Sequence, residues 1–136
     1  MKITVSQTIH CTPSQAWTFW TEPPHIQNWC HASDDWAVGE VTNDVKVGGH
    51  FLTNMHAKDG NAGFDFTGIY SIVEPNQKLT YHITGGREVD ITFASEGDNT
   101  LVTETFDAET ENSEERQRTG WQAILDNFKK YCEGQK

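Results

Sequence analysis

The middle of this chain consists of short segments in which apolar and polar residues alternate, separated by residues that favour tight turns. Alternation with a period of two is typical of strands that bury one face. The first two segments, residues 51–55 and 64–72, flank a turn at residues 58–61. Pairing Met55 with Phe64 makes their apolar faces coincide. The pattern therefore predicts an antiparallel meander with one buried face.

The same buried face continues through the following strands. Pairing Ile72 with Leu79 carries it across the second turn. A two-residue turn after Ile83 would turn the wrong face of the next strand inward, whereas a three-residue loop, Gly85–Gly86–Arg87, places Ile83 opposite Val89. We predict the longer loop, with its arginine at the tip.

The last strand of the meander directs a carboxylate toward the core. Pairing Phe93 with Val102 makes Val102, Glu104 and Phe106 the inward set. A buried carboxylate without a partner costs several kcal/mol, or its pKa rises so that the group stays neutral. The position of Glu104 therefore needs an explanation.

The N-terminal residues predict a strand followed by a helix. Residues 3–9 alternate between apolar and polar side chains, as in a half-buried strand. Thr12 and Gln15 have the spacing of a capping box, and a helix should begin at about Pro13.

A longer helix is predicted at the C-terminus. It should begin after Asn112 or Ser113 and end at Gly134. Gly120 lies inside it at a cost of about 1 kcal/mol relative to alanine, which indicates that its backbone approaches the sheet closely. The apolar stripe of this helix consists of Trp121, Ile124, Leu125, Phe128, Tyr131 and Cys132.

Together these elements predict a single α+β domain, residues 1–136. One long helix with one apolar face lies across an antiparallel sheet of about six or seven strands, which gives two layers. Aromatic side chains between a curved sheet and a single helix leave space near its ends, so an internal cavity is expected.

Composition limits what the chain can bind. Twenty acidic and ten basic residues give a net charge of −10, which disfavours nucleic acid and anionic lipid surfaces as partners. No signal peptide and no run of eighteen apolar residues is evident, so membrane insertion is not expected. Three cysteines without C-x-x-C spacing indicate reduced thiols and a cytoplasmic protein, and no cofactor is expected.

Four motifs, in this order along the chain, resemble those of the START-like (SRPBCC) superfamily. They are TPSQAW at residues 12–17, VGGHF at 47–51, FTGIY at 66–70 and GWQAIL at 120–125. Within the superfamily, the chain is most similar to the domain named for the activator homologue of the heat-shock chaperone's ATPase. The resemblance covers essentially the whole chain. It implies the helix-grip fold of the birch-pollen allergen, with one or two short helices after the first strand and an apolar pocket around the C-terminal helix.

The segment HIQNWCHASDDW, residues 25–36, combines possible metal ligands with a neighbouring cysteine and histidine. Its spacing matches no common ligand set, and the adjacent Cys30 and His31 point apart in an extended chain, so we predict neither a metal site nor a nucleophile pair. In the resembled fold this segment borders the pocket mouth, with Trp29 and Trp36 as its anchors.

Two roles are left open for Glu104. The helix-grip order places the first strand beside the last, which would allow Gln7 to hydrogen-bond Glu104 in a structural pair. Alternatively, Glu104 contacts a ligand or acts as a general acid or base.

Three functions follow from these observations. The first is a soluble protein that binds a small, mainly apolar molecule between sheet and helix. The second is an enzyme like the cyclases and hydrolases of this fold, with Glu104 as the candidate catalytic residue. The third, suggested by the family name alone, is a module that regulates a chaperone ATPase; the eukaryotic activators carry a separate N-terminal chaperone-binding domain for which these residues leave no room. A homodimer is left open.

The candidate ligand-binding residues are Trp29, Trp36, Phe51, Thr53, Phe66, Tyr70, Tyr81, Ile91, Glu104, Trp121 and Leu125.

Overall fold

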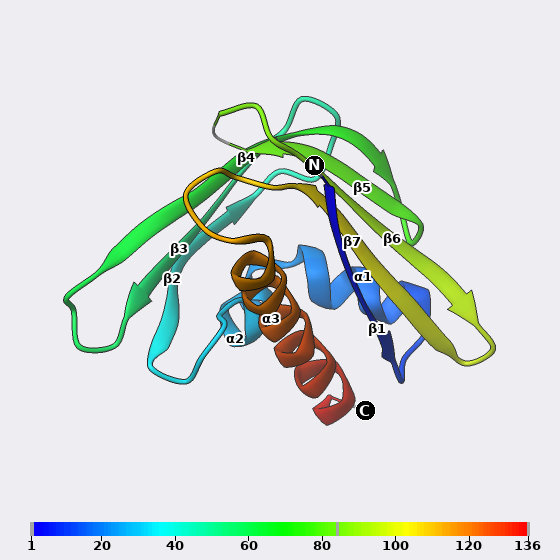
Figure 1. Ribbon diagram of the computed structural model, residues 1–136. Helices are drawn as coiled ribbons and strands as arrows, with labels where there is room; N and C mark the ends of the chain where they lie inside the picture. The colour runs from blue at the N-terminus through cyan, green and yellow to red at the C-terminus, as the bar shows by residue number, and fades with distance from the viewer. Residues whose placement is uncertain (1, 84, 136) are drawn as a thin grey trace.

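The computed structural model describes residues 2–83 and 85–135, which form one antiparallel sheet and three helices (Figure 1). The strands are β1 (Lys2–Ile9), β2 (Trp36–Asn43), β3 (His50–Ala57), β4 (Gly63–Glu74), β5 (Lys78–Ile83), β6 (Glu88–Glu96) and β7 (Asn99–Asp107). The helices are α1 (Pro13–Thr21), α2 (Pro23–Trp29) and α3 (Glu114–Gly134). The strand order is β1-β7-β6-β5-β4-β3-β2, and the sheet curves around α3 (Figure 1). The predicted α+β helix-grip architecture is confirmed.

The first helix begins as its sequence predicts. The Thr12 hydroxyl accepts the backbone N–H of Gln15, and the Gln15 side chain accepts the backbone N–H of Thr12. This capping box pairs backbone groups that the start of a helix otherwise leaves without partners. Helix α1 accordingly starts at Pro13.

Two of the predicted strand registers are confirmed. Met55 pairs with Phe64 in the β3–β4 hairpin. Phe93 pairs with Val102 in the β6–β7 hairpin, and Glu104 is therefore on the inner face, where it is 4% exposed. In both hairpins the turn residues and the apolar faces specify the same pairing.

The predicted register between β4 and β5 is wrong at one end. Ile72 pairs with Thr80 rather than with Leu79, because a bulge between Tyr70 and Ile72 adds one residue to β4. Since side chains alternate with a period of two, the extra residue turns Ile72 to the outer face, where it is 37% exposed.

The loop between β5 and β6 also differs from the prediction. The backbone N–H of Ile83 donates to the carbonyl of Arg87, so Ile83 lies opposite Arg87 and not opposite Val89. The register differs by two residues, which leaves Ile83 and Val89 on the same buried face. Arg87 is therefore at the base of the loop instead of its tip. Gly85–Gly86 adopts positive φ values of 91° and 83°, a backbone region in which glycine is unstrained.

Helix α3 lies across the concave face of the sheet and packs mainly against β1, α1 and α2. Ser113 is its N-cap, since its hydroxyl accepts the backbone N–H of Arg116, and the helix ends at Gly134 as predicted. The interpretation of Gly120 is wrong, because a Cβ atom at this position would have no neighbouring atom within 4 Å. Within the described residues, none of the helices combines the length and apolar character that crossing a bilayer requires.

An aromatic cluster fills one end of the space under the sheet. The ring centroid of Trp20 lies 4.8 Å from those of both Trp29 and Phe128, and 5.9 Å from that of Phe93. Phe128 and Leu125 are fully buried. This end of the molecule is a close-packed core.

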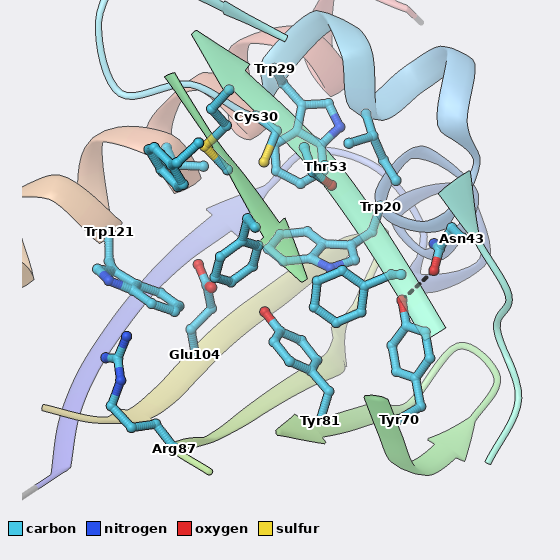
Figure 2. Close-up of a pocket in the computed structure, with 16 residues that line it drawn as sticks. Trp20, Trp29, Cys30, Asn43, Thr53, Tyr70, Tyr81, Arg87, Glu104 and Trp121 are labelled. Atoms are coloured by element: carbon cyan, nitrogen blue, oxygen red, sulfur yellow. Dashed lines mark hydrogen bonds between the residues drawn. The ribbon is translucent and has the colours of Figure 1, made fainter. Parts of the chain in front are cut away.

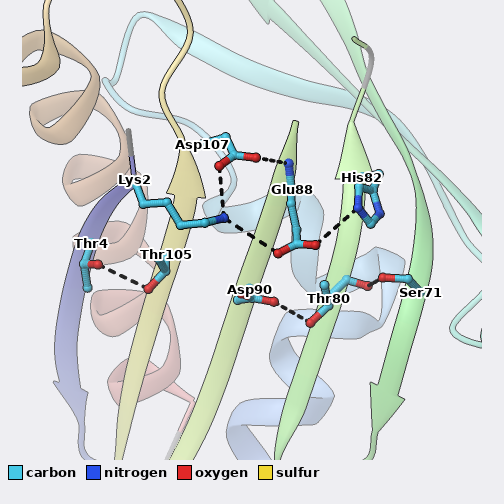
Figure 3. A network of polar contacts seen from close by, with 9 residues as sticks. All are labelled: Lys2, Thr4, Ser71, Thr80, His82, Glu88, Asp90, Thr105 and Asp107. Carbon is cyan, nitrogen blue, oxygen red and sulfur yellow. Dashed lines mark hydrogen bonds and ion pairs between the residues drawn. The ribbon is translucent and has the colours of Figure 1, made fainter. Parts of the chain in front are cut away.

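The convex face of the sheet carries a network of polar contacts (Figure 3). Lys2 Nζ lies 3.0 Å from Asp107 Oδ1 and 3.7 Å from Glu88 Oε1, and Glu88 Oε2 lies 3.3 Å from His82 Nε2. These groups are partly exposed, so each pair contributes little to stability.

Candidate ligand cavity

A cavity of about 290 Å³ lies between the concave face of the sheet and the helices α2 and α3 (Figure 2). Of the residues predicted to bind a ligand, those that line it are Trp29, Phe51, Thr53, Phe66, Tyr70, Tyr81, Glu104 and Trp121. The remaining three lie elsewhere. Ile91 and Leu125 are fully buried in the core, and Trp36, at the start of β2, has its ring centroid 6.0 Å from that of Phe64.

Further lining residues were not predicted as ligand contacts. They are Trp20, Ile26, Cys30, Asn43, Met55, Phe64, Arg87 and Ile124. Met55 and Phe64 share the inward phase of the predicted β3–β4 hairpin, so the alternation already contained a signal for them. Asn43 and Arg87 lie at strand ends, where the bulge in β2 and the position of the β5–β6 loop decide the direction of the side chain.

Glu104 is the central polar group of this cavity. Strand β7 holds it between Val5 of β1 and Ile91 of β6, and its carboxyl group points into the cavity (Figure 2). Among residues 2–83 and 85–135, no hydrogen bond or ion pair to this carboxyl group is recorded. Burial raises its pKa from 4.5 to about 8, because transfer from water disfavours the charged form. Glu104 is therefore mostly protonated at pH 7 and can donate a hydrogen bond.

The structural pair with Gln7 is not formed. Gln7 is opposite Val102, and its Nε2 donates to Asp126 Oδ1 of α3 at 3.1 Å. The first strand does run beside the last, but the register places Val5 opposite Glu104. This outcome removes the pair with Gln7 as an explanation for Glu104, and the roles in ligand contact and in acid or base chemistry stay predictions.

Tyr81 and Cys30 line the cavity together with Glu104 (Figure 2). Burial, and then the proximity of Glu104, raise the pKa of the Tyr81 hydroxyl well above its usual value and that of the Cys30 thiol to about 12. Both groups are neutral at pH 7. The Cys30 thiol is thus a weak nucleophile, because only a thiolate reacts readily.

Tyr70, the other predicted tyrosine, is already satisfied within the protein. It lies opposite Tyr81, as predicted, and its hydroxyl donates to Asn43 Oδ1 at 2.6 Å. Asn43 Nδ2 in turn donates to the carbonyl of Thr21 at 2.7 Å. This chain ties β4 to the end of β2 and to α1, and so holds the cavity wall in place.

The cavity opens between α3 and the β3–β4 hairpin. Phe64, which lines it, is 52% exposed, and Trp121 and Ile124 of α3 are half-buried. Here Phe66 and Trp121 are in edge-to-face contact, with ring centroids 6.4 Å apart, and Trp121 stacks on Phe106 at 3.9 Å. The entrance is therefore apolar and bordered by aromatic rings.

The segment at residues 25–36 is more ordered than an opening loop. Most of its first half forms α2, and Trp29 is 3% exposed, with its indole N–H donating to the carbonyl of Phe19. His31 is held by Asn127 of α3, whose Nδ2 donates to the His31 carbonyl. Within the described residues, no group of three or more histidine, cysteine or acidic side chains is placed to hold a metal ion.

The curved sheet, the long C-terminal helix and the cavity between them define a START-like helix-grip protein with an internal pocket. The chain belongs to the family described as Activator of Hsp90 ATPase homolog 1-like protein, whose family model matches residues 10–133. The predicted resemblance is thereby confirmed.

Solved structures support the same assignment. The AHSA1-like protein from Aeromonas hydrophila is 47% identical over 98% of this chain and 93% of that chain, with a TM-score of 0.93. Chr148 from Cytophaga hutchinsonii is also 47% identical over the same shares, with a TM-score of 0.85. CalU16 from Micromonospora echinospora, 23% identical over 96% of this chain and 75% of that chain with a TM-score of 0.72, shows the fold alone. No match was found among functionally curated proteins.

Proposed function

We propose that this protein binds a small, mainly apolar molecule in the cavity between the sheet and α3. The observation that carries the proposal is about 290 Å³ of space, bordered by aromatic rings, with a buried carboxyl group directed into it. Ligand pockets typically begin at about 300 Å³ and combine apolar walls with a few polar groups. An apolar void also lowers the stability of a fold, and a molecule that fills the void would offset this loss.

Glu104 and Tyr81 are the polar groups available to orient such a molecule. Neither has a recorded hydrogen-bond partner in the described part of the chain, whereas Tyr70 is bonded to Asn43. A protonated carboxyl and a phenol both donate hydrogen bonds. They suit a carbonyl, ether or hydroxyl oxygen on the ligand.

Native mass spectrometry and solvent extraction of the purified protein test this proposal. We expect a bound molecule to be recovered from the wild type and lost from Ile124→Trp, whose larger ring would enter the cavity. Lys130→Trp is the matched control on the exposed side of α3 and should retain the molecule. Equal recovery from both variants would place the molecule outside the cavity and contradict the proposal.

A second candidate function is acid or base catalysis by Glu104. A catalytic group works best when its pKa lies near the working pH, and the pKa of Glu104 is about 8. If a turnover is found, Glu104→Gln should lower its rate by roughly a hundredfold or more, and an unchanged rate would exclude this role. Regulation of a chaperone ATPase is suggested by the name of the family alone, and a pull-down with the chaperone would test it.

A further inference from the structure

A second, polar pocket adjoins the mouth of the apolar cavity. It is an open pocket of about 300 Å³, and its walls include Arg87, Arg116, Gln117, Gly120 and Trp121. Arg87 and Trp121 also line the apolar cavity. These two side chains are therefore part of the walls of both spaces.

The polar pocket concentrates the arginines of an acidic protein. The chain has a net charge of −10 and three arginines, at positions 87, 116 and 118. Two of the three line this pocket. The third, Arg118, forms an ion pair with Glu114 at 3.2 Å.

The two pocket arginines retain free hydrogen-bonding capacity. Arg87 Nη1 donates to the carbonyl of Asp107 at 3.2 Å, which uses one of its five donors. For the Arg116 guanidinium, no hydrogen bond or ion pair is recorded within residues 2–83 and 85–135. Glu109 also lines the pocket, but its carboxylate accepts the backbone N–H groups of Glu111 and Asn112.

The wall of this pocket is held in place by a buried side chain. Gln117 is 8% exposed, its Oε1 accepts the backbone N–H of Glu109, and its Nε2 donates to the carbonyls of Glu109 and Asn112. These three bonds fix the loop before α3 against the helix. The loop that borders the pocket is thus held to α3 by hydrogen bonds.

Gly120 keeps the pocket open. A glycine inside a helix costs about 1 kcal/mol relative to alanine, and packing does not require one here, because a Cβ atom would meet no atom within 4 Å. The space that a larger side chain would fill is the polar pocket itself. The missing side chain therefore serves the pocket rather than the core.

We propose that the ligand of the cavity is a single amphipathic molecule whose anionic group binds Arg87 and Arg116 in the polar pocket while its apolar body lies in the cavity. This inference rests on the proposed function and specifies the class of ligand. Guanidinium groups bind carboxylates and phosphates through paired, charge-assisted hydrogen bonds. Glu104 lies deeper in the cavity, on the inner face of β7, and disfavours a second anion there.

Matched probes test this inference in the protein of residues 1–136. Binding of decanoate and of decan-1-ol, which share an apolar chain and differ in charge, is measured at pH 7 by isothermal titration calorimetry. We expect decanoate to bind about tenfold more tightly, which is the usual effect of hydrogen bonds to a charged group. Arg116→Gln and Arg87→Gln should each remove most of this preference. Arg118→Gln, at the ion-paired arginine, should leave it unchanged.

The outcomes separate the inference from the proposed function. If both probes bind with equal affinity, the cavity is a binding site and the anion requirement is wrong. If neither binds, the proposed function fails and this inference fails with it. Acetate is the third probe: if it binds as tightly as decanoate, the pocket takes a separate small anion and the single-molecule form of the proposal is overturned. If Arg87→Gln does not fold, Arg116→Gln still decides, because its guanidinium makes no recorded contact whose loss would affect folding.

Discussion

Replacement of Glu104 by glutamine should change how the stability of the protein depends on pH. The pKa of this carboxyl group is about 8 in the folded protein, against an ordinary value of 4.5 that applies when the chain is unfolded. Between these values, the folded state keeps a proton that the unfolded state releases. The free energy of unfolding contributed by Glu104 is therefore unchanged below about pH 4.5, falls as the pH rises toward 8, and is lowest above 8.

The size of the expected change in unfolding free energy follows from the difference between these two pKa values. One pH unit corresponds to about 1.36 kcal/mol, so the full loss from pH 4.5 to above pH 8 is about 5 kcal/mol, and roughly 3 to 4 kcal/mol of it lies between pH 5 and pH 8. A glutamine has nearly the same shape as a protonated glutamate and does not ionise. The Glu104→Gln variant should thus become more stable than the wild type as the pH rises.

Urea denaturation of both proteins at pH 5, 6, 7 and 8 measures this difference. Every other titrating group contributes equally to the two proteins, so the change in their stability difference with pH isolates Glu104. The free-energy cost of burying the glutamine amide is the same at every pH. It therefore shifts all the stability differences equally and leaves their dependence on pH unchanged. Parallel curves for wild type and Glu104→Gln would refute the assignment of a neutral buried acid.

Three further substitutions test the fold. Gly120→Ala should raise the free energy of unfolding by about 1 kcal/mol, because the helix gains propensity and the new Cβ meets no atom; a loss of stability in urea denaturation would mean that the backbone is closer to the sheet than described. Thr12→Ala should lower it by about 1 kcal/mol through loss of the capping box, whereas Thr12→Ser should restore most of it. Phe128→Ala should lower it by about 3 to 5 kcal/mol in thermal or urea unfolding, because its ring is fully buried between Trp20 and Trp29; a change below 1 kcal/mol would contradict a packed cluster.

The sequence predicted those parts of the fold in which local and long-range signals agree. In the β3–β4 hairpin, the turn chemistry and the alternation both require Met55 opposite Phe64, and this pairing is found. The capping box at Thr12 is a local device that depends only on its own four residues. Glu104 was predicted to face inward because the strand before it and the turn between them were both assigned correctly.

The structure departs from the prediction where one extra residue in a strand, or a turn at a different position, changes which side chains lie opposite each other. Nothing in the residues around Ser71 indicates a bulge, yet the bulge turns Ile72 outward. The loop after Ile83 could close at more than one position along the chain with the same buried face, and the face alone could not choose between these positions. That choice moved Arg87 from a loop tip to the inner edge of the sheet, where it lines both pockets. The place of Arg87 in the walls of both pockets was therefore invisible to sequence reasoning.

The Gly120 prediction failed for a different reason. A glycine in a helix was attributed to packing because close approach is its commonest structural explanation. The structure has open space at this position instead. The loss of helix stability at Gly120 is therefore associated with a pocket that a larger side chain would fill, and not with close packing.

Several unfavourable features coincide in one part of this molecule. The cavity loses the van der Waals contacts that a filled core would make, the carboxyl group of Glu104 is removed from water without a recorded partner in the described residues, and Gly120 weakens the helix that forms the neighbouring wall. In the core next to the cavity, the cluster around Phe128 shows that this chain can pack aromatic rings closely. Departures from local stability rules tend to gather at functional sites. A leucine at position 104 or an alanine at position 120 would relieve the cost at its own position with little change to the fold. The coincidence of these costs around the cavity and the adjoining polar pocket therefore supports the proposal that a ligand occupies both.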